Sequence, residues 1–162
     1  MTKPAPTLRF LFSHPAHFLA LGFGSGLAPA APGTFGTLVA IPFAALLRAR
    51  FDDLGYALVV GVLFVVGVGV SGKTGRDLGA ADHGAIVWDE IVAFLAVLFF
   101  VPGDLFSIAV AFVLFRVFDI VKPPPIRAVD AALKSGFGVM LDDLLAAGYT
   151  LLVLALARRI LG

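Results

Sequence analysis

Five stretches of the chain are almost continuously apolar, and polar connections rich in glycine and proline separate them. They cover roughly residues 34–47, 56–71, 86–101, 105–121 and 143–160. Each is long enough for a helix, yet somewhat shorter than the ~20 residues of an ideal membrane span. The pattern predicts an all-α protein, a polytopic membrane bundle of four to five short helices forming one domain over residues 1–162.

Prolines mark several of the boundaries. Pro42 lies inside the first stretch, so this segment is expected to be broken, and a re-entrant or interfacial placement stays open beside a full crossing. The KPPP sequence at 122–125 ends the fourth stretch, because it cannot continue a helix. The short VPGD turn at 101–104 predicts that the third and fourth helices pack antiparallel.

Composition indicates that lipid is the solvent. Hydrophobic residues make up 60% of the 162 residues and charged residues 14%, whereas soluble domains carry about a quarter charged residues. The net charge of +1 gives no support for a nucleic-acid partner. The absence of cysteine excludes disulfides, thiolate metal sites and cysteine nucleophiles.

Charge also distinguishes the two sides of the predicted bundle. If all five stretches cross, one side holds seven basic residues and the other holds four. The two sets are Lys3, Arg9, Lys73, Arg76, Lys122, Arg127 and Lys134 against Arg48, Arg50, Arg158 and Arg159. The positive-inside rule predicts that the first side is cytoplasmic. Eight of the eleven acidic residues lie in or near the connections of that side, so polar chemistry is expected there.

The sequence ADHGAIVWDE, residues 81–90, places Asp82 before the third helix and Asp89 with Glu90 at its mouth. Carboxylates in such a place suit a hard cation such as Mg²⁺, although interfacial charges paired with lysine or arginine are the alternative. His83 is a candidate acid, base or ligand, or an ordinary loop residue. Trp88 is expected to be an interfacial anchor.

Three charged residues follow one side of the fourth helix, because Arg116, Asp119 and Lys122 are spaced i, i+3, i+6. Counting back from the 101–104 turn places Glu90 and Asp119 at comparable depth. Arg116 and Lys122 are then predicted to clamp a phosphate, with Asp119 joining the metal site. The alternative is an Arg116–Asp119 salt bridge that only holds the helices together.

Two further segments carry candidate residues. Asp142 and Asp143 stand at the predicted start of the fifth helix, where capping explains one of them and a metal or catalytic role remains open for the pair. The glycine-rich sequence at 22–36 resembles an anion-binding loop but is not a Walker loop, since no Gly-Lys-Ser/Thr follows. Its candidate phosphate contacts are Gly24, Ser25, Gly26 and Thr34, and close helix packing is the alternative role.

Taken in order, the segments GFGSGLAPAAPGTFGT, DHGAIVWDEI, FRVFDIVKPPPIR and GFGVMLDDLLAAG strongly resemble the bacterial phosphatidylglycerophosphatase A family. The resemblance runs from about Gly22 to Gly148, most of the chain. One departure is visible, because Ser135 stands where the family tends to have the first glycine of a pair. The resemblance implies a multi-pass enzyme of the bacterial inner membrane, with its active site on the cytoplasmic side.

The reaction that the resemblance implies is removal of the phosphate monoester of a phospholipid, phosphatidylglycerophosphate, to give phosphatidylglycerol, with Mg²⁺. The carboxylates hold one or two Mg²⁺ ions: Asp89, Glu90, Asp119 and Asp142 or Asp143. A carboxylate, with Asp89, Asp119 and Asp142 as candidates, or His83 handles the proton. Attack by water is favoured over an aspartyl-phosphate intermediate, because a DxDxT signature is absent. Hydrolysis of another lipid phosphate such as phosphatidate, or a non-enzymatic cation carrier, is the alternative function.

Overall fold

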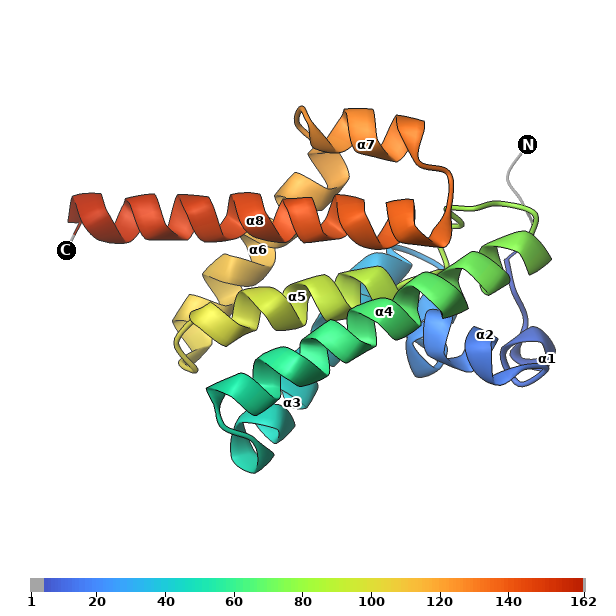
Figure 1. The fold of residues 1–162 in the computed structure, drawn as a ribbon, viewed down its shortest axis with the longest axis horizontal. Coiled ribbons are helices and arrows are strands. Elements are labelled where there is room, and N and C mark those ends of the chain that lie inside the picture. Colours follow the sequence, from blue (N-terminus) through green and yellow to red (C-terminus); the bar gives the residue numbers. More distant parts are fainter. Residues whose placement is uncertain (1–4, 162) are drawn as a thin grey trace.

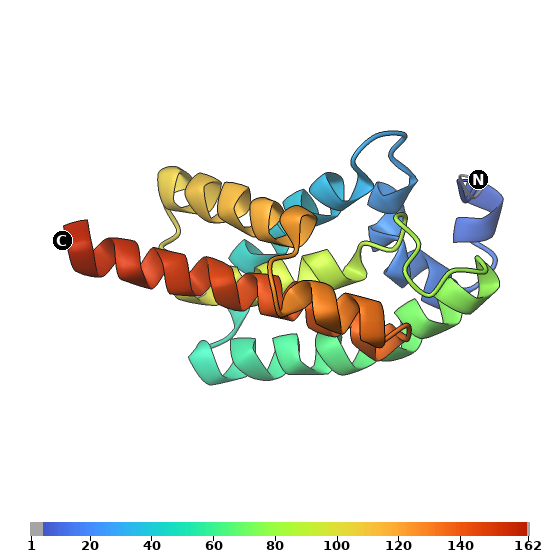
Figure 2. The same cartoon turned by 90° about the horizontal axis from the view of Figure 1, so that it is seen from above.

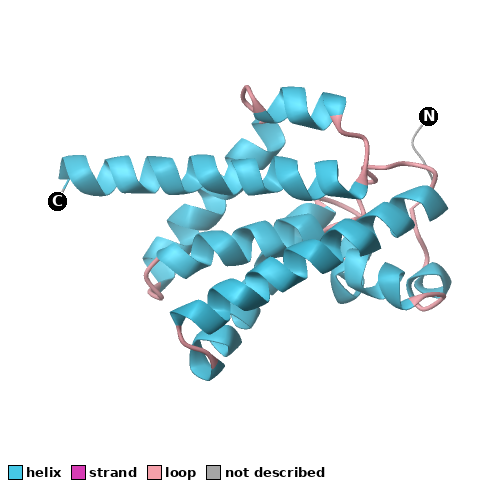
Figure 3. Cartoon of the chain, viewed as in Figure 1, coloured by secondary structure: helices cyan, strands magenta, loops and turns pink. Residues whose placement is uncertain are grey.

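The chain is helical throughout the part that the structure describes. The structure is a computed structural model and describes residues 5–161, which contain helices and loops and no strand (Figure 3). In chain order the helices are α1 (Leu8–Leu11), α2 (Pro15–Ala20), the 3₁₀ helix η1 (Gly22–Leu27), α3 (Pro32–Arg50), α4 (Asp53–Asp77), α5 (Trp88–Phe100), α6 (Leu105–Val121), α7 (Ile126–Ala132) and α8 (Gly136–Leu161). The prediction of an all-α bundle is confirmed. Lys3, counted in the charge argument, lies outside the described residues.

Three helices, α3, α4 and α8, are long and apolar enough to cross a membrane. With 25 residues in α4 and 26 in α8, the prediction that every helix falls short of a full span is wrong for these two. The helix α8 is longer than predicted because it begins at Gly136 instead of residue 143. The helix α6 has the predicted bounds and 17 residues, and α5 has 13.

Pro42 does not break the first of these spans. The helix α3 continues through it from Pro32 to Arg50. Ala40 and Ala44 on either side are buried in the main hydrophobic core. Tertiary packing of this kind stabilises a helix more than intrinsic propensity does, and it offsets a proline cost of about 3 kcal/mol. The first apolar stretch therefore forms a helix that is long enough to span.

The connections gather at the two ends of the bundle in the predicted way (Figures 1 and 2). The helices α1 and α2 and the α4–α5 connection lie at one end, here called the N-terminal end. The α3–α4 turn, the α5–α6 turn and the C-terminus lie at the other, the C-terminal end. The helix α7 lies alongside the first half of α8. The acidic connections are thus brought to one end of the molecule.

The helix α5 forms the centre of the core. Nine of its residues are buried, and it packs chiefly against α8, α3 and α4, and less against its hairpin neighbour α6. Trp88 is only 4% exposed and its indole N–H donates to the carbonyl of Leu63 over 3.1 Å. The expectation that Trp88 is an interfacial anchor is therefore wrong, since its ring fills the interior between α4 and α5.

The outer helices present apolar side chains to their surroundings. Large hydrophobic residues are exposed along α4, α6 and α8, including Leu58, Val65, Leu105, Phe106 and Ile160. Soluble monomers rarely expose apolar surface on this scale. The described chain is therefore a membrane protein in which α5 is surrounded by protein and the outer helices face lipid.

Close contact between α4 and α8 depends on glycine. A Cβ at Gly136 would lie 2.1 Å from the carbonyl oxygen of Val68 and 2.6 Å from the amide nitrogen of Gly72. Only a residue without a side chain permits this approach. Ser135 precedes it, and its hydroxyl accepts a 3.2 Å hydrogen bond from the amide of Gly138, which caps the start of α8.

Short helices at the N-terminal end were not predicted. The helix α2 begins with Pro15 and is capped by His14, whose ring nitrogen accepts from the amide of Ala16 over 3.0 Å. A polar residue followed by proline is a start signal that the sequence does contain. His17 of α2 is buried and lies 2.7 Å from the carboxylate of Asp77, so α2 is held against the end of α4.

Candidate active site

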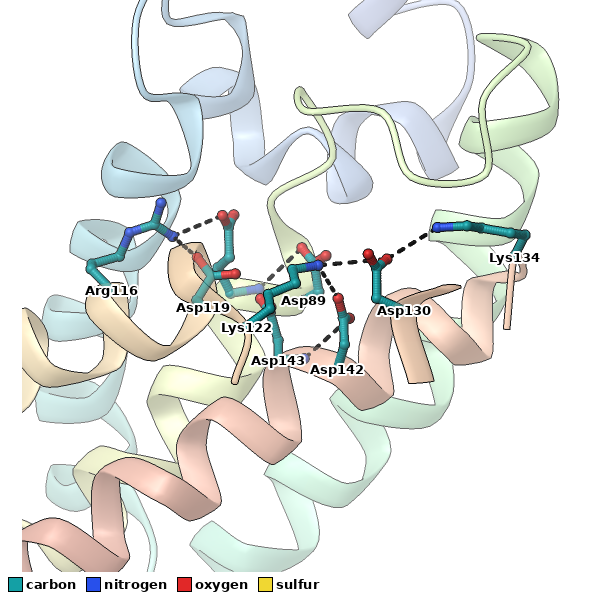
Figure 4. Close-up of polar contacts among 9 residues, drawn as sticks. Asp89, Arg116, Asp119, Lys122, Asp130, Lys134, Asp142 and Asp143 are labelled. Atoms are coloured by element: carbon teal, nitrogen blue, oxygen red, sulfur yellow. Dashed lines mark hydrogen bonds and ion pairs between the residues drawn. The ribbon is translucent and has the colours of Figure 1, made fainter. Parts of the chain in front are cut away.

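Carboxylates from three helices meet at the N-terminal end (Figure 4). Asp89 and Glu90 come from the first turn of α5, Asp119 from the last turn of α6, and Asp142 with Asp143 from about two turns into α8. All are buried except Glu90, whose side chain is 12% exposed. One oxygen each from Glu90, Asp119 and Asp143 lie within 4.8 Å of one another. The prediction that Glu90 and Asp119 share one depth is confirmed.

Capping does not explain the acidic pair of α8. The sequence suggested that Asp142 and Asp143 stand in the first turn of this helix. The helix begins at Gly136, so the pair lies inside it instead. Each is only 3% exposed. The Asp142 carboxylate accepts a 3.1 Å hydrogen bond from the amide of Asp143. Burying two adjacent carboxylates costs free energy, which points to a role for the pair outside helix formation.

Arg116 of α6 pairs with two carboxylates, one on α6 and one on α5. Its guanidinium donates to Glu90 over 2.9 Å and lies 2.6 Å from Asp119 (Figure 4). The salt bridge within α6 that was the alternative interpretation is therefore present, and it extends to a second helix. Nε of Arg116 is buried without a hydrogen-bond partner, and so are Oε2 of Glu90 and Oδ2 of Asp143. Such atoms are rare in proteins and mark a place where a ligand can bind.

Lys122 takes a different set of partners. It ends α6 in the left-handed conformation, with φ of 46°, which turns its side chain towards α8. Its ammonium group is hydrogen-bonded to Asp142 and lies 3.6 Å from Asp130, which is in turn 3.3 Å from Lys134. Burial disfavours the charge, but the hydrogen bond and the negative field of Asp142 outweigh it and raise the pKa of Lys122 above its usual value.

The loop before α5 borders the same site. Asp82 is exposed, and its charge also acts on Lys122. His83 is partly buried and its Nδ1 accepts a 3.2 Å hydrogen bond from the amide of Ala85. The amide of Val87 donates to the carbonyl of Ala20 over 2.9 Å, which fixes the loop on α2. The loop thereby brings Asp82 close enough to Asp89, Glu90 and Asp142 for their negative charges to repel one another.

In the glycine-rich segment at 22–36, the part that contacts the site is the start of α3. The hydroxyl of Ser25 donates to the carbonyl of Gly22 over 2.8 Å, Gly24 has φ of 105°, and Gly26 packs against the carbonyl of Ala85. These contacts shape a turn. Thr34 lies in the first turn of α3 directly after Gly33, and Gly33 contacts Glu90 and Arg116. Sequence reasoning missed Gly33, although a glycine that follows a proline at a helix start was the available signal.

Comparison with known proteins assigns the chain to a family. The family model described as phosphatidylglycerophosphatase A matches residues 18–158. The chain is 42% identical over 154 residues to phosphatidylglycerophosphatase A of Haemophilus influenzae, covering 94% of each chain. It is 45% identical over 145 residues to phosphatidylglycerophosphatase A of Escherichia coli, covering 89% of this chain and 84% of that one. The chain belongs to the phosphatidylglycerophosphatase A family.

A third relative carries a different name. The chain is 38% identical over 157 residues to a protein of Bacteroides thetaiotaomicron named as a putative phosphatidylinositol-3-phosphatase, covering 89% of this chain and 94% of that one. No solved structure matches the chain. Membership of the phosphatidylglycerophosphatase A family confirms the predicted resemblance and the prediction that the chain is a phosphatase.

The residues of this family member fit a divalent cation. Glu90, Asp119 and Asp143 offer three oxygens within 4.8 Å of one another, and two oxygens of this set are buried without a partner. Mg²⁺ prefers oxygen ligands and binds through few carboxylates, because it keeps waters and substrate phosphates in its coordination sphere. The donor set is thus compatible with Mg²⁺. Asp89 and Asp142, the other predicted ligands, flank these three residues.

Proposed function

We propose that the chain hydrolyses the phosphate monoester of phosphatidylglycerophosphate, giving phosphatidylglycerol and phosphate, in the bacterial cytoplasmic membrane. One observation carries the proposal: buried carboxylates and the Arg116 guanidinium, with Nε of Arg116, Oε2 of Glu90 and Oδ2 of Asp143 unpaired, converge at one end of a membrane bundle. The names of two relatives supply the substrate. The lipid tails then stay in the bilayer while the terminal phosphate enters the site.

Mg²⁺ is the proposed cofactor, held by Glu90, Asp119 and Asp143 with Asp89 and Asp142 beside them. When bound, it would make a coordinated water a better nucleophile and offset the charge of the phosphate. The unpaired oxygens of Glu90 and Asp143 support this assignment. Lys122 holds Asp142 in place through their hydrogen bond.

Arg116 is the cation proposed to bind and orient the phosphate. Arg116 keeps its contacts with Glu90 and Asp119 while its free Nε–H donates to a phosphate oxygen. Thr34 follows Gly33 in the first turn of α3, and its hydroxyl is the proposed second donor to the phosphate. Donors fixed in this way stabilise the charge that develops as the phosphorus–oxygen bond lengthens.

The reaction balances with water alone as co-reactant. The bond from the water oxygen to phosphorus forms as the bond from phosphorus to the glycerol oxygen breaks. Asp89 accepts the proton that the water loses and returns it to the glycerol oxygen, which leaves as the alcohol. His83 is the second candidate for the base, so Asp89→Asn and His83→Gln in parallel separate the two.

The position of basic residues supports a cytoplasmic active site. The last turns of α4 and α6, the helix α7 and the α7–α8 connection lie near the carboxylates, and they carry the basic residues that the positive-inside rule expects on a cytoplasmic face. These residues are Lys73, Arg76, Lys122, Arg127 and Lys134. A cation carrier is disfavoured, because a carrier needs polar groups along a path and the buried carboxylates of the described residues gather at one end.

Phosphate release from a panel of lipid phosphates tests the proposal. Purified protein in detergent is given phosphatidylglycerophosphate, phosphatidate or phosphatidylinositol 3-phosphate, with Mg²⁺ or with chelator. The expected result is chelator-sensitive release with the highest kcat/KM on phosphatidylglycerophosphate. Faster release from phosphatidylinositol 3-phosphate would mean that this lipid is the substrate, as the name of the third relative states for that protein. Release from no lipid would refute the function.

A matched pair of variants accompanies this assay. Asp119→Asn is expected to lose activity. Asp104→Asn at the C-terminal end is expected to keep it, because Asp104 only caps α6 through the amide of Ser107 at 2.9 Å and asparagine caps equally well. Equal losses in both variants would mean that Asp119 has no special role in the reaction.

A further inference from the structure

Gly33 lies where the first turn of α3 meets the carboxylate of Glu90. It follows Pro32, the first residue of the helix, and it is buried. A Cβ built at Gly33 would lie 1.8 Å from Oε1 of Glu90, 2.7 Å from its Cδ and 3.0 Å from Nη1 of Arg116. The carboxylate of Glu90 thus occupies the space that the side chain of any other residue at this position would need.

The neighbour at Gly33 differs from those at Gly26 and Gly136. At Gly26 an added Cβ would meet the carbonyl oxygen of Ala85 at 2.0 Å, and at Gly136 the carbonyl oxygen of Val68 at 2.1 Å. Those atoms belong to the backbone and cannot move without the helix. The carboxylate of Glu90 is the end of a flexible side chain, so an alanine at Gly33 displaces the carboxylate and leaves the fold in place.

We infer that Gly33 is a positioning residue. Because it has no side chain, it leaves room for the Glu90 carboxylate to lie between Arg116 and the carboxylates of Asp119 and Asp143. The inference rests on the proposed function in that it takes Glu90 as part of the active site. Oε1 of Glu90 is tied to Arg116 over 2.9 Å and Oε2 is unpaired. A displaced carboxylate either loses the arginine or turns its free oxygen away from the other two acids, and both changes disrupt the site.

Gly33→Ala compared with Gly61→Ala tests the inference. Gly61 lies inside α4 with nothing within 4 Å of an added Cβ, so it controls for the gain in helix propensity from glycine to alanine. Gly33→Ala is expected to lower kcat on the order of tenfold or more, as an ångström-scale misplacement does, while its thermal midpoint in detergent falls less than that of Gly136→Ala. Gly136→Ala is the contrasting variant and is expected to lose stability.

A second measurement detects the carboxylate without turnover. Mg²⁺ alone is added to each variant, and the rise in thermal midpoint is recorded. Gly61→Ala is expected to keep the wild-type rise, and Gly33→Ala is expected to lose most of it. The double variant Gly33→Ala with Glu90→Asp supplies a shorter side chain that fits beside alanine. It is expected to be no less active than Glu90→Asp alone, because both changes act on one contact.

Each outcome decides the inference. Wild-type activity in Gly33→Ala, losses that add in the double variant, or a stability loss as large as that of Gly136→Ala would overturn it. If the wild-type protein released phosphate from no lipid, the proposed function would fail by itself. The Mg²⁺-induced rise in thermal midpoint would still decide whether Gly33 positions Glu90, since an unchanged rise in Gly33→Ala contradicts the inference.

Discussion

The guanidinium of Arg116 donates a 2.9 Å hydrogen bond to the carboxylate of Glu90, and this ion pair connects α6 to α5. The two helices contact each other less than either contacts α8. The two side chains are 13% and 12% exposed, so the charges balance each other where water reaches them poorly. The pair therefore has a structural effect and a chemical effect, and the two can be separated by experiment.

Arg116→Gln is expected to lower both stability and activity. Removing the guanidinium leaves the partly buried Glu90 and the buried Asp119 without a cation, which costs about 3 kcal/mol in the free energy of unfolding. The loss of a phosphate donor is expected to lower kcat on the order of a hundredfold. Thermal unfolding in detergent and phosphate release measure the two effects. Arg158→Gln, exposed at the C-terminal end, is the control, and equal behaviour of the two variants would contradict the assigned role.

Asp143→Asn is expected to stabilise the protein when no metal is added. Asp143 is 3% exposed and offers an oxygen within 4.8 Å of two other carboxylates, so a neutral side chain relieves repulsion by roughly 1 kcal/mol. The same variant is expected to lose the rise in thermal midpoint that Mg²⁺ gives the wild type. Asp53→Asn, exposed in the first turn of α4, should keep that rise. A full Mg²⁺ effect in Asp143→Asn would remove Asp143 from the metal site.

Lys122 is expected to stabilise the protein throughout the physiological pH range. Burial opposes its charge, but the carboxylate of Asp142 raises the pKa of Lys122 above its usual value. A raised pKa gives stability that is complete below the unfolded value of about 10.4 and is lost only as pH rises through the folded value. The difference in thermal midpoint between wild type and Lys122→Gln should therefore be constant from neutral pH to about pH 10. A difference that shrinks near neutral pH would contradict the ion pair with Asp142.

The orientation in the membrane can be measured with single cysteines, because the chain has none of its own. Lys134→Cys places a thiol at the N-terminal end and Gly103→Cys places one at the C-terminal end, both at exposed positions. A membrane-impermeant maleimide is expected to label Gly103→Cys in spheroplasts and Lys134→Cys only in inside-out vesicles. The opposite pattern would put the carboxylates on the outer face.

The sequence allowed much of the bundle to be predicted, because apolar stretches and proline stops are local signals. The bounds of α6 follow directly from the VPGD turn and the KPPP stop. The start of α8 was missed because Gly136 and Gly138 have low helix propensity and indicate a loop. Contact with Val68 and Gly72 across the helix pair overrides that propensity, and a single sequence does not reveal such a contact.

The candidate site was predicted as a set of residues and not as an arrangement. Spacing brought Glu90 and Asp119 to one depth, which the structure confirms. Which oxygens come together depends on the rotation of three helices about their axes, and hydrophobic pattern defines that rotation only loosely. Trp88 shows the same limit, since an indole beside two carboxylates suggested a membrane interface while its ring lies in the core.

Arg48 explains how a helix of 13 residues can carry the site. Such a helix rises about 20 Å and cannot cross a hydrocarbon layer of about 30 Å. Its last carbonyl groups would lack donors inside lipid, but the guanidinium of Arg48 from α3 donates to the carbonyls of Leu98 and Val101. A neighbouring helix thus takes the place of water at the end of α5. The length of the helix that bears Asp89 and Glu90 is thereby independent of bilayer thickness, which the lipid-facing helices around it must match.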